Sequence, residues 1–156
     1  MEVHPPLGAV CFHVLSIAHS LMRMFIVAVG RLRPPYQDDV QHYRKMLARY
    51  ANVEAIELRD EEKVAGRIPG DAYVVLLSSD GQTMDSLQFA KFIDERRQAA
   101  RDVYFVIGGP HGVDIDASDL KLSFGPITLP HQLARVVLLE QIYRAHKIIA
   151  REPYHY

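Results

Sequence analysis

The chain has 156 residues and a formal net charge of −1, with 49% hydrophobic and 24% charged residues. This length predicts a single domain, and this composition excludes disordered, collagen-like and coiled-coil proteins. A nearly neutral chain has no general attraction to nucleic acid, so any RNA contact requires a local patch among its 13 arginines and 5 lysines.

Residues 1–23 are expected to precede the domain rather than to form part of it. The segment 7–21 is apolar but is interrupted by histidines and serines, and it is too short to span a membrane. Glu2 is the only charge before it, so the basic start of a signal peptide is missing. Two interpretations remain. We favour a disordered or upstream-start extension, because chain ends are commonly poorly ordered; the other is a short helix packed on the domain.

The first half of the chain alternates between strands and a helix. Residues 25–29 are a continuous apolar run that ends at Gly30, the pattern of a strand buried on both faces. After the break at Pro34-Pro35, residues 36–50 carry apolar side chains at spacings of three and four, which predicts an amphipathic helix. Residues 53–58 alternate in polarity and indicate a second strand.

The second half continues this alternation after a polar loop at residues 59–71. Strands are predicted at residues 72–77, 103–107 and 120–124, and helices at residues 86–97 and 131–150. Strands that alternate with helices imply a parallel α/β sheet, in which ligands bind at the carboxyl ends of the strands. We therefore expect pocket walls in the segments that follow Gly30, Leu77, Ile107 and Phe124.

Two of these segments are rich in glycine and proline. Residues 108–112 suit a ligand-binding loop, since glycine permits positive φ and close approach to the main chain, or a tight strand-to-helix turn without a ligand. They match neither the G-x-G-x-x-G dinucleotide fingerprint nor the P-loop. Residues 125–130 are suited to present backbone groups to an adenine edge and apolar side chains to its ring; the alternative is an ordinary loop.

The final helix is apolar on more than one face, so it either lies in the core or is half-buried against a partner. Buried polar groups need partners, and Glu140, Gln141 and Arg144 are expected to form a hydrogen-bonded network. We favour a structural role for Glu140 over a catalytic one. The tail at residues 146–156 has aromatic and cationic side chains that suit a flipped base and its phosphates; the alternative is a frayed chain end.

No metal site is expected. Cys11 is the single cysteine, which excludes an intramolecular disulfide and a cysteine-based zinc cage and fits a reducing cytoplasm. The eight histidines include no pair at the i,i+4 spacing that places two imidazoles on one helical face.

Four segments, in this order and spacing, resemble the C-terminal half of the RlmH family: residues 107–112, 127–131, 138–145 and 153–156. These are small SPOUT-class methyltransferases that use S-adenosylmethionine to methylate N3 of a pseudouridine in 23S ribosomal RNA. The resemblance runs from about Met24 to the C-terminus, and the family begins at a strand equivalent to residues 24–30. It therefore predicts one SPOUT methyltransferase domain at residues 24–156.

The resemblance implies an α/β-knot fold: a parallel sheet of about five strands flanked by helices, with a C-terminal trefoil knot. It also implies a cytoplasmic homodimer that acts on 23S rRNA within the assembled ribosome and completes each active site across the two-fold interface. The S-adenosylmethionine site is expected to include Leu77, Gly108, Gly109, Gly112, Gly125, Pro126, Ile127, Thr128, Leu129 and Pro130. RNA contacts are expected at His131, Arg135 and Arg151, and catalytic roles at His155, Arg144 and Tyr154.

Within that mechanism, His155 is the best candidate to accept the proton of N3, since an imidazole titrates near neutral pH. Arg144 or Arg151 is a candidate to stabilise the developing anion.

The sequence also departs from the family pattern. The segment 59–71 is too short for the family's helix, Ser78 and Gln82 replace an expected aspartate and lysine, and Tyr156 stands at the usually basic end. These departures leave open a catalytically inactive ribosome- or RNA-binding module. An unrelated nucleotide-binding enzyme is disfavoured by the missing phosphate motifs.

Overall fold

The computed structural model describes residues 22–109, 113, 115 and 117–154. It contains every predicted strand and helix, in the order β1 (Arg23–Val29), α2 (Tyr36–Leu47), β2 (Asn52–Leu58), β3 (Tyr73–Thr83), α3 (Ser86–Gln98), β4 (Val103–Ile107), β5 (Leu120–Ser123) and α4 (His131–Ile149). Two short 3-10 turns, Glu61–Lys63 and Ala65–Arg67, occupy the predicted polar loop.

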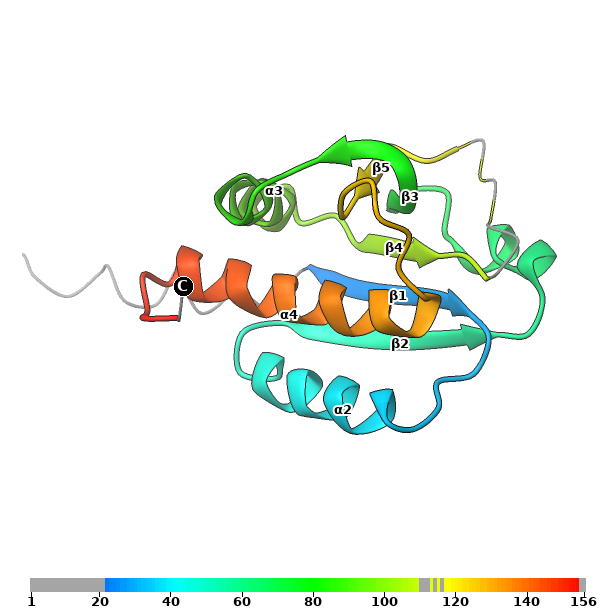
Figure 1. Cartoon of the computed structure of the whole chain (residues 1–156). Helices are drawn as coiled ribbons and strands as arrows, with labels where there is room; N and C mark the ends of the chain where they lie inside the picture. The colour runs from blue at the N-terminus through cyan, green and yellow to red at the C-terminus, as the bar shows by residue number, and fades with distance from the viewer. Residues whose placement is uncertain (1–21, 110–112, 114, 116, 155–156) are drawn as a thin grey trace, which may run out of the picture.

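The five strands form one parallel sheet in the order β2-β1-β4-β3-β5. Because all pairings are parallel, the carboxyl ends of β1, β2 and β4 lie along one edge, as the sequence predicts. β3 reaches this edge at Leu77 and then runs on to Thr83. In Figure 1 the arrowheads of β1, β2 and β4 point to the end of the molecule where α4 begins, and the C-terminus lies at the opposite end.

Two apolar layers hold this arrangement together. On one face of the sheet, α4 packs between α2 and α3 (Figure 1), and fully buried side chains such as Met24, Phe105 and Leu138 fill the layer. On the other face, Val64 and Ile115 cover β1 and β4. Val64 is fully buried, so the short segment between β2 and β3 is pinned to the sheet despite its polar composition.

Two element boundaries differ from the predictions by more than two residues. The helix expected at residues 36–50 ends at Leu47, and Tyr50 closes a turn onto the Leu47 carbonyl at 2.8 Å. Tyr50 is nonetheless buried against α4, which explains why its spacing continued the helical pattern. β3 runs on to Thr83, because residues after Leu77 pair a second time with β5.

At the N-terminus, Met22 is buried in the core and Arg23 belongs to β1, so both are part of the domain rather than of the expected extension. The Arg23 guanidinium donates to Asp102 at 2.7 and 3.1 Å. The expectation for residues 1–21 lies outside the described residues. The trefoil knot stays a prediction, because part of the chain path between β4 and β5 is not described.

Gly81 marks the place where β3 shifts register against β5. A Cβ there would lie 2.7–2.8 Å from the backbone of Lys121 and Leu122. We expect Gly81→Ala to lower the free energy of unfolding by about 1–3 kcal/mol, because one of the two strands must move. Gly66→Ala is the matched control, since nothing lies within 4 Å of its Cβ position. Equal denaturant midpoints for the two variants would contradict this expectation.

Candidate active site

A pocket of about 710 Å³ opens at the carboxyl edge of the sheet. Its walls are the middle of β3 at residues 77–79, the end of β5, the segments after β4 and β5, and the first turn of α4. The lining residues are Leu77, Ser78, Ser79, Ile107, Gly108, Gly109, Val113, Leu122, Ser123, Phe124, Gly125, Ile127, Thr128, Leu129, Pro130, His131 and Ala134. Three of the four predicted wall segments therefore meet here. The fourth, after Gly30, is not a wall, although the ring of His131 lies 3.6 Å from where a Gly30 Cβ would stand.

Eight of the ten expected cofactor residues line this pocket, namely Leu77, Gly108, Gly109, Gly125, Ile127, Thr128, Leu129 and Pro130. Pro126 is not among the lining residues, and Gly112 lies outside the described residues. Their contact with a cofactor stays a prediction.

Sequence reasoning missed Ser123, which is buried at the end of β5. Its hydroxyl accepts a hydrogen bond from the Gly125 N–H at 3.1 Å and lies 3.0 and 3.3 Å from the carbonyls of Gly125 and Ser79. It thereby ties the wall after β5 to the wall formed by β3 at Ser79. The available signal was a polar residue at the end of an apolar strand, since a buried hydroxyl needs a partner.

Two glycines have conformational reasons for their positions. Gly125 has a φ of 116°, which disfavours any side chain at the start of the 125–130 loop. At Gly109, a Cβ would lie 2.9 Å from Glu61 Oε1 and 3.3 Å from Val29 Cγ1. Glu61, in the short segment after β2, thus supports the glycine-rich loop from behind.

The pocket has the size and composition of a small-molecule site: apolar side chains, several hydroxyls and exposed loop backbone. Apolar residues such as Leu77 and Leu129 suit an adenine ring, and the serines and loop backbone suit the polar parts of an adenosine-type ligand. Among the described residues, no group of three His, Cys, Asp or Glu side chains could hold a metal ion. No helix in that same part of the chain is long and apolar enough to cross a membrane.

A polar network occupies the outer side of α4, centred on Glu140. Its carboxylate accepts hydrogen bonds from Gln141 at 2.6 Å, from Arg144 at 2.6 and 3.0 Å and from the Tyr154 hydroxyl at 3.1 Å. The network expected from the sequence is therefore present within one chain. Ser86 of α3 extends it by donating to Gln141 at 3.1 Å.

Tyr154 is packed as well as hydrogen-bonded. Its ring lies under the Arg144 guanidinium at 4.6 Å and meets the edge of Tyr143 at 5.0 Å. Burial, followed by the charge of Glu140, raises the pKa of the Tyr154 phenol far above its ordinary value. Tyr154 is therefore a hydrogen-bond donor at neutral pH rather than a base.

The start of the tail is anchored by a second cluster. Glu152 accepts hydrogen bonds from Lys147 and, at 2.6 Å, from the Tyr50 hydroxyl. The Lys147 ammonium, followed by the Tyr50 hydroxyl, lowers the pKa of the Glu152 carboxyl below its ordinary value of 4.5. The contribution of these hydrogen bonds to stability is fully present above pH 4.5, and it is lost as the pH falls through the lower pKa that Glu152 has in the folded protein.

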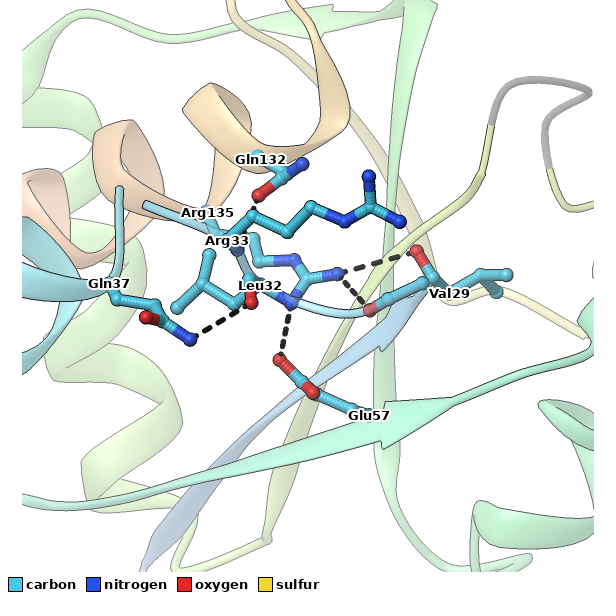
Figure 2. A network of polar contacts seen from close by, with 8 residues as sticks. Val29, Leu32, Arg33, Gln37, Glu57, Gln132 and Arg135 are labelled. Carbon is cyan, nitrogen blue, oxygen red and sulfur yellow. Dashed lines mark hydrogen bonds and ion pairs between the residues drawn. The ribbon is translucent and has the colours of Figure 1, made fainter. Parts of the chain in front are cut away.

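Arg135, for which an RNA contact was predicted, is buried in the domain instead. It is only 5% exposed, and its guanidinium donates to Glu57 at 2.9 Å and to the carbonyls of Gly30 and Val29 at 2.5 and 3.3 Å (Figure 2). Burial lowers the pKa of this guanidinium, while the charge of Glu57 opposes that effect. Arg135 is thus part of the interior, with its guanidinium donating to protein acceptors.

The remaining candidates lie at opposite ends of α4. His131 lines the pocket at its first residue, whereas Arg151 is exposed just beyond its last turn, with a φ of 55°. A helix of 19 residues is about 28 Å long, so the pocket and the tail of one chain are far apart. His155 lies outside the described residues.

Comparisons with known proteins agree with this architecture. A family model described as a predicted SPOUT methyltransferase matches residues 22–155. Two curated proteins named ribosomal RNA large subunit methyltransferase H are similar: that of Gemmatimonas aurantiaca is 39% identical and that of Carboxydothermus hydrogenoformans 37% identical. Each comparison covers 86% of this chain and 99% of the relative.

The fold alone is shared with a more distant protein. The crystal structure of a probable methyltransferase from Bordetella pertussis Tohama I has a TM-score of 0.56 and 10% identity, covering 85% of this chain and 99% of that one. The family model and the identity to both relatives extend over nearly the whole described domain. The chain therefore belongs to the SPOUT methyltransferases, in the RlmH family.

Proposed function

We propose that this chain is an S-adenosylmethionine-dependent methyltransferase that modifies N3 of a pseudouridine in 23S rRNA, on the assembled ribosome and in the cytoplasm. The observation that carries the proposal is the pocket at the carboxyl edge of the sheet, which three predicted strand-end segments build together. The names of the two relatives, which specify large-subunit ribosomal RNA, support the choice of substrate.

S-adenosylmethionine supplies a methyl group that its sulfonium already activates. The pocket's task is therefore to orient the donor and to exclude water. Ser123 holds two of the walls in register, and Gly125 allows the last wall to turn towards α4. Eight expected cofactor residues on these walls are consistent with a bound adenosine group.

We infer a homodimer in which the tail of one protomer completes the pocket of the other. Within one chain, the pocket and the tail are separated by the length of α4, about 28 Å. An antiparallel pairing of two α4 helices would bring each tail to the partner's pocket. The outer side of α4 suits such a contact, because half-buried Leu133, Val137 and Ile148 flank the Glu140 network. Leu87, 68% exposed on α3, extends the apolar surface.

In this arrangement Tyr154 and Arg144 are preordered to receive the target base. The ring of Tyr154 provides a stacking surface, and Arg144 provides positive charge beside it. Glu140 holds both groups, which keeps its own role structural. The Tyr154 hydroxyl donates its proton to a hydrogen bond with Glu140, so His155 is the group we assign to accept the N3 proton.

Calorimetric titration of S-adenosylmethionine into the purified protein tests the cofactor part of this proposal. We expect saturable binding, and at 100 times its dissociation constant the ligand should stabilise the fold by about 2.7 kcal/mol. Methylation of ribosomes that lack the modification, followed by mass spectrometry of the nucleosides, tests the substrate part. No binding at millimolar cofactor would contradict the enzyme and favour the inactive ribosome-binding module.

A further inference from the structure

The loop between β1 and α2 presents two unpaired arginines. Arg31 and Arg33 are exposed on either side of Leu32, which is partly buried against the core. Neither guanidinium has a hydrogen-bond or ion-pair partner within the described part of the chain. Arg23, Arg97, Arg135 and Arg144, by contrast, each donate to a carboxylate.

Side chains from three other elements fix the backbone of this loop (Figure 2). Arg135 of α4 binds the carbonyls of Val29 and Gly30, as described above. Glu57 of β2 accepts from the Leu32 N–H at 2.9 Å, and Gln132 of α4 accepts from the Arg33 N–H at 2.7 Å. Gln37 of α2 donates to the Leu32 carbonyl at 3.1 Å. The two arginines therefore project from a rigid support, which reduces the entropy lost when they bind a ligand.

A third arginine lies at the neighbouring strand end. Gly30 donates its N–H to the Leu58 carbonyl at 2.8 Å, and the β1–β2 register, in which Val29 pairs with Leu58, continues to place Arg59 beside Gly30, one residue before Arg31. Arg59 is exposed and, like the other two, has no partner for its guanidinium among the residues described. We call Arg31, Arg33 and Arg59 the arginine edge.

Three carboxylates at the end of β2 and just after it have contacts of their own. Glu57 is engaged by Arg135 and by the Leu32 N–H, and Asp60 pairs with Lys63 at 2.6 Å. Glu61 faces the glycine-rich loop at Gly109.

The arginine edge adjoins the cofactor pocket. His131, which lines the pocket, lies beside Gly30, and Gln132 in the next position binds the Arg33 backbone. A nucleotide whose base enters the pocket mouth would therefore have its flanking phosphates within reach of this edge. A chain with a net charge of −1 needs such a local patch to hold RNA.

We propose that the arginine edge binds backbone phosphates of the ribosomal RNA that flank the target nucleotide. This inference rests on the proposed function. Guanidinium groups bind phosphate oxygens through two parallel hydrogen bonds, and exposed guanidiniums without protein partners are free to do so. Arg135 then acts on RNA binding only through the loop it holds, as a positioning residue.

The test is a comparison of Arg31→Ala/Arg33→Ala with Lys45→Ala/Lys91→Ala, which removes the same charge from the exposed surfaces of α2 and α3. Binding of each to ribosomes is measured over a range of salt concentrations. We expect the arginine variant to bind roughly 10- to 100-fold more weakly, with a salt slope lower by about one per lost phosphate contact. Its affinity for S-adenosylmethionine should equal that of the unaltered protein.

Ribosome affinity and salt slope equal to those of the lysine variant would overturn the proposal. Arg31→Lys/Arg33→Lys keeps the charge and should retain most of the salt slope while losing part of the affinity. Failure of the proposed function is read separately, from cofactor binding and methyl transfer by the unaltered protein. A drop in ribosome affinity on removing the arginines supports the arginine edge whichever way that second measurement turns out.

Discussion

Deletion of residues 151–156 is expected to slow methyl transfer at least about 100-fold while affinity for S-adenosylmethionine stays within about twofold, since loss of alignment at the reacting atoms is costly. The tail carries Tyr154 and His155, whereas the pocket lies at the other end of α4. Single-turnover methylation at saturating cofactor measures the first quantity, and calorimetry measures the second. An unchanged rate would contradict the proposed role of the tail.

A mixing experiment distinguishes an active site shared across the dimer from one contained in a single chain. Gly109→Val supplies the pocket-deficient partner, because Gly109 lines the pocket and its Cβ position is already 3.3 Å from Val29 Cγ1, which a branched side chain would crowd further. The Gly109→Val variant is mixed with the variant that lacks residues 151–156, and each of the two alone should be inactive. In a random mixture, half of the dimers are mixed and each has one intact site, so about one quarter of the activity should return. A mixture that stays inactive would contradict the shared site.

The spacing of apolar residues was enough to predict the sheet and its helices, because the side chains at those spacings form the buried core. Phe105 and Leu138 lie in such runs. The register shift between Leu77 and Gln82 could not be predicted, since it depends on where β5 ends and on the close approach at Gly81. Tyr50 led to a different error. It fits the apolar spacing of α2, so the sequence predicted it inside the helix, but it lies beyond the end of α2.

Part of the candidate site was likewise predictable from the sequence, and part was not. Glycine-rich and proline-rich segments at strand ends predicted the pocket, because parallel topology alone brings strand ends together. The roles of Ser123 and Arg135 could not be predicted, because they depend on which residues the fold brings next to them. An arginine in a helix usually faces solvent, and only the position of Glu57 on a neighbouring strand makes burial of Arg135 tolerable. Arg135 was predicted to contact RNA, but this contact with Glu57 places it where it supports the loop of the arginine edge.

Arg135→Ala is expected to lower the free energy of unfolding by about 1–3 kcal/mol, the usual cost of leaving buried acceptors without a donor, because Glu57 is 41% exposed and stays in contact with water. The carbonyls of Val29 and Gly30 would lose their donor, and Glu57 would lose its charged partner. For a domain of this size, the melting temperature should fall by roughly 4–12 °C. Differential scanning calorimetry measures the change.

Two further variants determine which property of Arg135 is responsible. Lys91→Ala removes an exposed ion pair with Glu95 and should cost less than about 1 kcal/mol. Arg135→Lys keeps the charge but lacks the planar fork that reaches Glu57 and the two carbonyls together, so it should recover only part of the loss. If Arg135→Ala melted at the same temperature as Lys91→Ala, the guanidinium would contribute no more than a surface cation. The rigid support of the arginine edge would then have to come from Glu57, Gln132 and Gln37.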